Sequence, residues 1–82
     1  MDIRKLICLI LRDIQKGEKE PKHEDYENVS FEEFANAVQI IHDEHYASNI
    51  TFAKGGRGNK ILVIFMNGAK ITMKGLNYIS SF

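Results

Sequence analysis

The N-terminal part of the chain carries apolar residues at helical spacing. Five of them fall on one face of a helix at 3.6-residue intervals: Ile3, Leu6, Ile7, Ile10 and Ile14. Asp2 suits the position before such a helix, and Gly17 suits the position just after it. Cys8 and two leucines widen the apolar surface beyond a single stripe. The pattern predicts a largely buried helix over residues 2–16.

A polar connector and a second helical pattern follow. Residues 17–28 are polar and contain the only proline, so we expect a connector with one short helical turn. Ser30 and Glu33 then form a Ser-x-x-Glu capping box, which predicts a helix over about residues 31–44. Its expected core face carries Phe31, Phe34, Ala35, Val38 and Ile41. Its opposite face carries Glu32, Glu33, Asn36, Gln39, Ile40 and Asp43.

The hydrophobic period changes after the second helix. Apolar residues fall at even positions within Tyr46–Phe52, and residues 61–66 form a continuous apolar run rich in β-branched side chains. Between these two predicted strands lies the basic segment Lys54–Lys60, which contains three glycines. The three features together predict a β-hairpin with a long, flexible and basic tip.

The end of the chain predicts a turn and a short helix. Asn67–Gly68 is a turn sequence, and Thr72 can cap a final helix that carries Leu76 and Ile79. Gly75 lies one turn inside that helix, where glycine costs up to about 1 kcal/mol relative to alanine. A glycine at such a position often marks the close approach of another segment.

The composition is that of a single small domain, and the charges are distributed unevenly along the chain although the net charge is zero. The 82 residues suit one domain, residues 1–82, with 44% hydrophobic and 27% charged residues and a formal net charge of zero. Residues 1–45 hold all eleven acids and six of the eleven bases, a net charge of −5. Residues 46–82 hold the other five bases and no acid, a net charge of +5. Such asymmetry concerns partners rather than the fold.

The longest apolar runs are too short for a membrane or secretory role. Leu6–Leu11 spans six residues and is closed by Arg12 and Asp13, whereas a bilayer span needs about 20 apolar residues. The single Cys8 excludes an internal disulfide and has apolar neighbours, as expected of a small buried hydrophobe. We therefore expect a cytoplasmic protein that does not bind a membrane.

Two motifs with known chemistry fail on spacing. Lys60 in the glycine-rich segment is followed by a strand, whereas a phosphate-binding P-loop needs a serine or threonine and then a helix. His42 and His45 lack a recognisable third and fourth ligand for zinc. No nucleophile, base and orienting group can be assembled either. We expect no enzyme activity, metal, cofactor or small-molecule substrate.

Two segments carry a resemblance to a known fold. Ile71–Ile79 resembles the Leu-Thr-x-Lys-Gly-x-x-Tyr-Leu sequence that leads from the wing into the last helix of many winged-helix proteins. Phe34–Tyr46 looks like the third helix of that fold running into its first wing strand. The whole order is similar to the YjcQ family of small bacterial and prophage proteins. His45 departs from the family pattern, where a helix-ending glycine is usual, and Ala47 replaces a larger apolar residue.

The resemblance implies an α+β fold and a phage or prophage setting. The expected fold is a winged helix-turn-helix, with helices packed on a small antiparallel β-hairpin wing and a short C-terminal helix. In such a fold the third helix enters the major groove of double-stranded DNA, and the wing touches the adjacent backbone. The candidate nucleic-acid-binding residues are Lys54, Arg57, Asn59 and Lys60 of the wing, with Asn36 and Gln39 of the helix.

The charges on the helix favour a second hypothesis. The helix carries no lysine or arginine, and its acids would repel DNA phosphates. The alternative is a protein-interaction module in which this acidic helix meets a protein partner or another copy in a homodimer, without DNA binding. Its candidate residues are Glu32, Glu33, Ile40 and Asp43. This alternative requires Ile40 to be exposed. The fold favours a DNA-binding regulator by a narrow margin.

Overall fold

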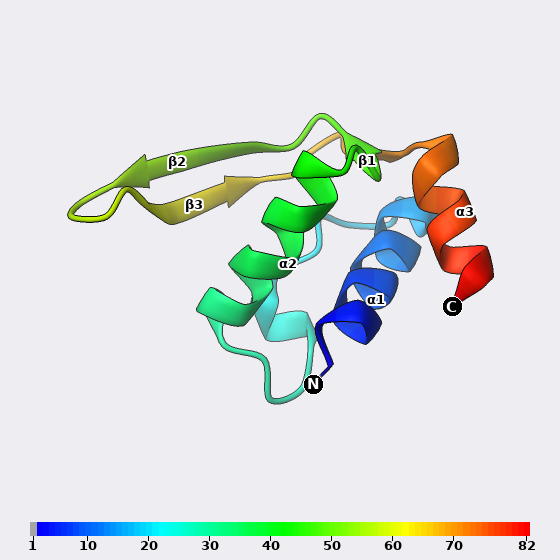
Figure 1. Cartoon of the computed structure of the whole chain (residues 1–82), viewed down its shortest axis with the longest axis horizontal. Coiled ribbons are helices and arrows are strands. Elements are labelled where there is room, and N and C mark those ends of the chain that lie inside the picture. The colour runs from blue at the N-terminus through cyan, green and yellow to red at the C-terminus, as the bar shows by residue number, and fades with distance from the viewer. Residues whose placement is uncertain (1) are drawn as a thin grey trace.

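The computed structural model describes residues 2–82. Its elements follow the predicted order (Figure 1): α1 (Ile3–Lys16), the 3₁₀ turn η1 (His23–Asp25), α2 (Phe31–Asp43), β1 (Ala47–Ser48), β2 (Thr51–Gly55), β3 (Lys60–Phe65), β4 (Lys70–Ile71) and α3 (Met73–Ser81). The helices form a body, and β2 and β3 extend from it as a hairpin arm. The principal extents of the Cα trace are 37 × 25 × 22 Å.

Helix α1 forms the centre of the body. The side chain of Asp2 accepts a hydrogen bond from the backbone N–H of Arg4 at 2.9 Å, and Gly17 ends the helix with φ +68°. Its buried residues are Leu6, Ile7, Cys8, Ile10, Leu11 and Ile14. The predicted helix and the buried cysteine are therefore confirmed. Arg12 Nε also lies 3.3 Å from Cys8 Sγ, as donor to the sulfur.

The connector between α1 and α2 is fixed at two places. Tyr26 is 8% exposed, stacks on Phe34 with ring centroids 5.9 Å apart, and donates its hydroxyl to Asp13 Oδ2 at 2.6 Å. Burial and the Asp13 carboxylate raise the pKa of Tyr26. Glu20 Oε2 accepts a hydrogen bond from the backbone N–H of Met66 at 2.6 Å. The predicted short helical turn is η1.

Helix α2 begins at the predicted capping box. Ser30 Oγ accepts from the N–H of Glu33 at 3.1 Å, and the Glu33 carboxylate accepts from the N–H of Ser30 at 3.2 Å. The buried residues of α2 are Phe34, Ala35, Ala37, Val38 and Ile41. Two residues are intermediate between the expected faces: Phe31, on the expected core face, is only partly buried, and Ile40, on the opposite face, is partly buried and packs against the core.

The end of α2 is a Schellman motif centred on His45. The N–H of Tyr46 donates to the carbonyl of Ile41 at 2.9 Å, and the N–H of His45 donates to the carbonyl of His42 at 3.2 Å. His45 takes the left-handed conformation, with φ +59°. Histidine therefore occupies the position at which glycine is usual, and it adopts the backbone conformation that glycine would supply.

The strands form two separate antiparallel pairs. β2 pairs with β3 from Thr51–Phe65 at the base to Gly55–Lys60 at the tip. The register shifts by one residue beyond the Ala53–Val63 pair, which leaves Leu62 as the extra residue of a bulge. The predicted hairpin is confirmed. A two-residue ladder between β1 and β4 at the base of the arm is an addition that the periodicity did not predict.

Helix α3 docks on the turn after α2. Thr72 Oγ1 accepts from the N–H of Gly75 at 3.1 Å and donates to the carbonyl of His45 at 2.6 Å. The N–H of Thr72 donates to the carbonyl of Tyr46 at 3.0 Å. A β-carbon on Gly75 would overlap that same carbonyl oxygen. The predicted cap and the close approach at Gly75 are both confirmed.

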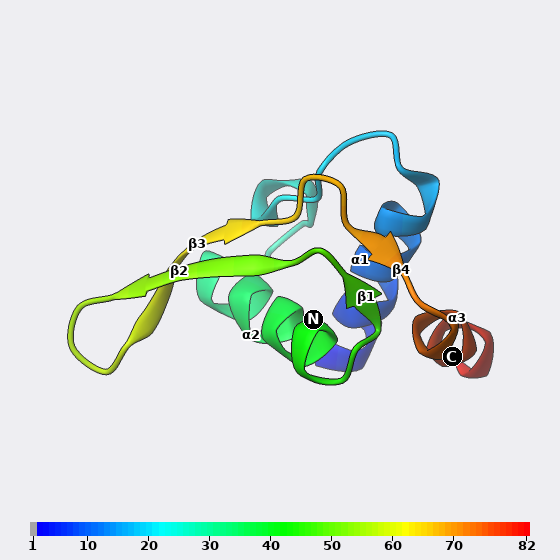
Figure 2. The ribbon, with the colours of Figure 1, turned by 90° about the horizontal axis from the view of Figure 1, so that it is seen from above.

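The architecture is α+β and has the form of a winged helix, with a short C-terminal helix. α1 and α2 pack against each other, η1 stands where a helix-turn-helix has its middle helix, and the β2–β3 arm is the wing (Figure 2). The core contains residues of α1, of α2, of the connector and of the base of the strands, with Met66 and Ile50 both buried. The arm reaches beyond this core.

Candidate nucleic-acid interface

A groove of about 390 Å³ lies between α2 and the far half of the arm. It is lined by Phe31, Glu32, Ala35, Asn36, Gln39, Gly58, Asn59, Lys60 and Ile61. Four of the six residues that the sequence singled out for DNA binding share this groove: Asn36, Gln39, Asn59 and Lys60. They come from two elements that are separated by about twenty positions in the chain. The groove is therefore a product of the fold rather than of a local motif.

The helical wall of the groove presents two amides and one carboxylate. Asn36 is exposed and Gln39 is partly exposed, and their three-residue spacing places them on one face of α2. Both side chains can donate and accept hydrogen bonds, which is the chemistry that reads adenine edges. Ala35 is buried and also lines the groove.

The other wall is the tip of the arm, whose backbone turns through left-handed conformations. Gly56, Gly58 and Asn59 have φ values of +72°, +80° and +55°. Asparagine tolerates this region better than most residues. The turn brings Lys60, the first residue of β3, opposite α2.

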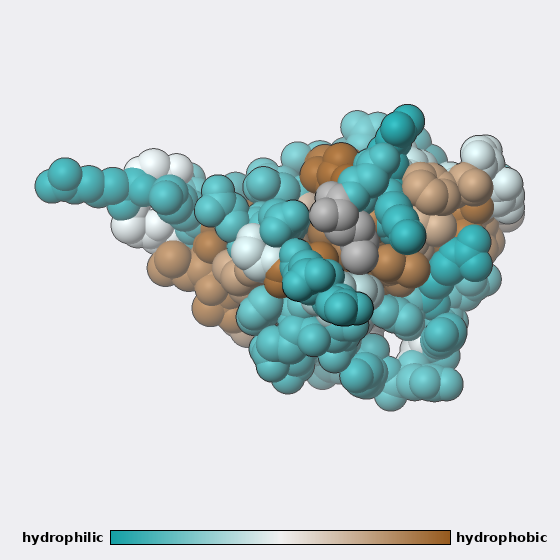
Figure 3. Space-filling view, turned by 90° about the horizontal axis from the view of Figure 1, so that it is seen from below, coloured by the Kyte–Doolittle hydropathy of each residue, from teal (hydrophilic) through white to brown (hydrophobic). Residues whose placement is uncertain are grey.

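Lys54 and Arg57 do not line the groove. Both are exposed on the arm, and within residues 2–82 neither they nor Lys60 form an ion pair. Figure 3 shows the hydrophilic end of the arm projecting beyond the body. The three cations are thus presented to solvent without an internal carboxylate to neutralise them.

The acids of α2, and Glu44 just after it, differ in their surroundings. Glu33 is engaged in the capping box, and Asp43 Oδ1 lies 3.0 Å from His42 Nδ1. Glu44 Oε1 accepts from Lys74 Nζ at 3.5 Å. Glu32 is the acid of α2 that lines the groove. Glu32 therefore gives the helical wall of the groove a carboxylate.

The histidines considered for a metal site have other surroundings. The His42 ring packs edge-on against Phe52, with centroids 5.2 Å apart, and His45 forms the turn after α2. Residues 2–82 contain no group of three or more His, Cys, Asp or Glu side chains that could hold a metal ion.

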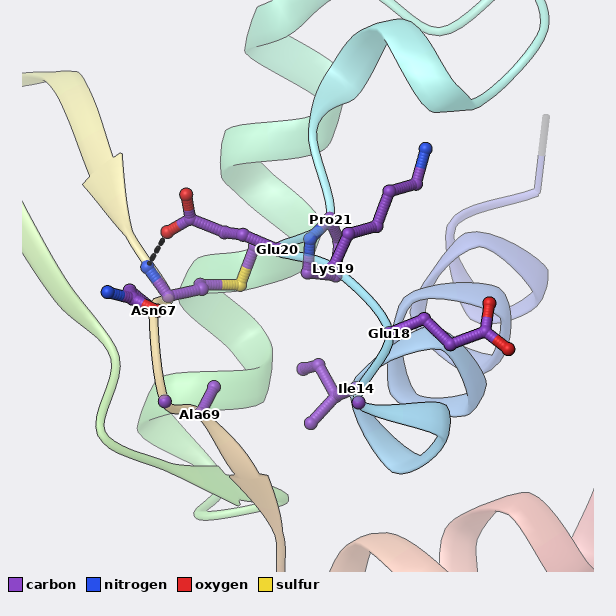
Figure 4. A pocket seen from close by; sticks show the side chains of 10 residues that line it. Ile14, Glu18, Lys19, Glu20, Pro21, Asn67 and Ala69 are labelled. Atoms are coloured by element: carbon purple, nitrogen blue, oxygen red, sulfur yellow. Dashed lines mark hydrogen bonds between the residues drawn. The ribbon is translucent and has the colours of Figure 1, made fainter.

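A second hollow, of about 220 Å³, lies between the connector and the turn after β3. Figure 4 shows Glu20 reaching across it toward the end of β3, where its carboxylate accepts the hydrogen bond from Met66. Ile14 and Ala69 also line this hollow. The contact fixes the connector to the base of the arm. No helix within residues 2–82 is long and apolar enough to span a membrane.

Sequence reasoning missed a hydrophobic surface on the arm. Leu62, Val63 and Phe65 are 58%, 44% and 51% exposed. Figure 3 shows hydrophobic surface between the hydrophilic tip and the body. The continuous apolar run predicted a strand, but a run without alternation does not tell which side chains stay exposed. The long glycine-rich tip could have indicated this exposure, because a strand that leads to such a tip extends beyond the core.

Comparison with known proteins places the chain in a family. No curated protein and no solved structure matches it. A sequence model of the family described as YjcQ protein matches residues 8–81, which is nearly the whole chain. The matched segment includes α2, the arm and α3, and thus both walls of the groove. The chain belongs to the YjcQ family.

Proposed function

We propose that this protein is a small DNA-binding regulator of a phage or prophage that holds one strand of duplex DNA between α2 and the arm. The observation that carries the proposal is the shared groove, in which Asn36 and Gln39 of the helix face Asn59 and Lys60 of the arm. Lys54 and Arg57 on the exposed arm meet neighbouring phosphates. The family resemblance supports the phage setting.

The groove suits a sugar-phosphate backbone flanked by base edges. A cation and an amide on the arm can bind phosphate oxygens, while the amides on the helix point toward the bases beside that strand. Phosphate contacts set affinity and position, and base contacts set sequence preference. In this arrangement the arm supplies most of the affinity, because α2 contributes no cation.

The small number of cations predicts modest affinity with a measurable salt dependence. Each phosphate that is neutralised contributes about −0.9 to the slope of log K against log salt, so three contacts give a slope of about −2.7. Binding by phosphate contacts alone lies in the range of about 10⁻⁴–10⁻⁶ M at physiological salt. We expect the protein to bind duplex DNA in this range unless the helix finds its preferred sequence.

The test is duplex binding measured by fluorescence anisotropy over a series of salt concentrations. Lys60→Ala is expected to weaken binding and to reduce the magnitude of the salt slope by about 0.9, because one phosphate contact is lost. Lys70→Ala is the matched control, because it removes the same charge from an exposed residue of β4 that does not line the groove. Its slope should equal that of the wild type.

Two outcomes would sink the proposal. The first is no duplex binding even at low salt. The second is an equal effect of Lys60→Ala and Lys70→Ala, which would indicate attraction by the overall charge rather than binding in the groove.

The alternative partner surface on α2 has less exposed apolar area than it requires. That surface required an exposed Ile40, and Ile40 packs partly buried against the core. The large apolar side chains that are exposed lie on the arm instead. If this protein contacts another protein chain, the arm offers more apolar surface than α2 does.

A further inference from the structure

The free edge of β3 is an open pairing surface. β3 is hydrogen-bonded to β2 on one side, and within residues 2–82 no strand pairs with its other edge. The N–H of Met66, just after the strand, donates to Glu20 of the connector, so this edge faces the connector. A hollow of about 230 Å³ lies beside it, lined by Leu62, Val63 and Ile64 and by connector residues.

Apart from Lys60 at its start and the bulge at Leu62, this edge lacks the features that usually prevent strand pairing. Exposed edges are normally protected by lysine, proline or an inward-pointing charge. Residues 61–66 contain no charged residue and no proline. Three of their side chains, Leu62, Val63 and Phe65, are 44% to 58% exposed. Such an edge pairs readily with another extended apolar segment.

The charges flanking the edge select a second copy of this chain as the partner. The arm, residues 51–66, carries three bases and no acid, a net charge of +3. The connector, residues 17–28, carries five acids and two bases, a net charge of −3. Antiparallel pairing about a twofold axis lays the basic tip of each arm beside the connector of the other copy. Both copies then gain the same attraction, as an isologous interface requires.

We propose that this protein forms a homodimer in which β3 pairs antiparallel with β3 of a second copy. The two arms then make one four-stranded sheet, with the twofold axis near Val63. Lys60 of one copy lies beside Glu20 of the other, because that carboxylate binds the N–H of Met66 at the opposite end of the strand. The pairing places apolar side chains of the second copy beside the exposed side chains of Leu62, Val63 and Phe65. A six-residue strand provides about 20 Å of contact along its length. The tip of each arm adds further contact with the partner's connector.

The first test is the oligomeric state by sedimentation equilibrium over a series of protein concentrations. Val63→Lys is expected to raise the dimer Kd by at least about tenfold, because it places two like charges at the axis. Val63 is 44% exposed, so the substitution is tolerated in the folded monomer, which circular dichroism checks. Thr51→Lys is the matched control: Thr51 is exposed on β2, away from the pairing edge, and its dimer should be unchanged.

The second test is cross-linking. Antiparallel neighbours at a twofold axis have Cα atoms about 4.5–5.5 Å apart, which suits a disulfide. Val63→Cys is therefore expected to form a disulfide-linked dimer under mild oxidation, and Thr51→Cys is not. Cys8 is 4% exposed and should not interfere.

A wild-type protein that stays monomeric at every concentration overturns the proposal. So does a Thr51→Lys variant that dissociates as readily as Val63→Lys, because that result indicates stacking through the face of the sheet. The proposal does not depend on DNA binding, and Val63 does not line the groove. Variants of Val63 therefore test the dimer, and variants of Lys60 test DNA binding, so the two proposals can fail independently.

Discussion

Gly75 shows how one residue decides the docking of a whole helix. Judged by helix propensity alone, alanine at this position would stabilise α3 by up to about 1 kcal/mol. The structure reverses that sign, because a β-carbon would overlap the carbonyl oxygen of Tyr46. That oxygen already accepts a hydrogen bond from Thr72 and belongs to the turn after α2, so it cannot move aside freely.

We expect Gly75→Ala to lower the free energy of unfolding by about 1–3 kcal/mol, the usual cost of overpacking. Urea denaturation followed by circular dichroism measures it. Asn77→Ala, at an exposed position of the same helix, is the control and should be neutral or slightly stabilising. A Gly75→Ala variant as stable as the Asn77→Ala variant would show that the turn yields.

His45 pays a conformational cost that another residue would avoid. Its φ of +59° lies in the left-handed region, which is unfavourable for residues with a β-carbon. The hydrogen bonds in which it takes part use only its backbone, including the carbonyl that accepts from Thr72. We expect His45→Gly to raise the free energy of unfolding by about 0.5–1 kcal/mol and His45→Ala not to. Thermal denaturation of both variants distinguishes relief of strain from loss of the imidazole.

At the scale of elements, local signals predicted where helices begin and end. The Asp2 cap, the Ser30–Glu33 capping box, Gly17 and the turn at Asn67–Gly68 act over four or five residues, so the sequence contains all that is needed to recognise them. It was harder to predict from the sequence which residues of α2 are buried. Angles around one helix give the directions of Phe31 and Ile40 but not which neighbours lie there. The core covers part of Ile40, and Phe31 lies at its margin, at the rim of two hollows.

The connector holds to α1 through a contact that should depend on pH. The pKa of Tyr26 is raised in the folded protein by burial and by the Asp13 carboxylate, which accepts its proton in a hydrogen bond. Tyrosine in the unfolded chain ionises near pH 10, and Tyr26 in the folded protein stays neutral there. The stability it contributes is therefore fully present below about pH 10 and is lost as the pH rises further.

We expect Tyr26→Phe to cost about 1–2 kcal/mol at neutral pH, since it removes a hydrogen bond to a charged group. Above about pH 10 the wild type loses stability as the unfolded tyrosine ionises, whereas the variant has no such group. The difference in free energy of unfolding between wild type and variant should therefore narrow by up to about 1.4 kcal/mol per pH unit. Urea titrations at neutral and alkaline pH give the two differences. A gap that stays constant across this range would contradict a raised pKa.

For the whole molecule, the sequence predicted which residues bear the chemistry but not how they are combined. Asn36, Gln39, Asn59 and Lys60 are polar residues of two separate elements, and folding brings them to one groove. Lys54 and Arg57 remain outside it. Their separation depends on the turn and bulge of the arm, which set its direction. The exposed apolar strand was not foreseen, since exposure depends on how far the arm extends beyond the body.

One negatively charged residue in the groove should lower the affinity for DNA. Glu32 lines the groove, so its charge opposes a phosphate bound there. We expect Glu32→Gln to tighten duplex binding by about three- to tenfold, equivalent to roughly 1 kcal/mol, with the gain shrinking at high salt. Asp43→Asn is the comparison, because it removes the same charge from an α2 residue outside the groove, and it should change affinity much less. Equal gains from both would indicate a uniform field.

The reach of the arm also gives this protein two levels of stability. Backbone hydrogen bonds toward the tip run between β2 and β3, so breaking them exposes little of the core formed by α1 and α2. Their amide hydrogens should exchange with solvent through local opening, while those of α1 exchange only when the whole domain unfolds. Evolution can therefore alter the length, charge and edge of the arm at little cost to folding, whereas the helical body is constrained by its packing.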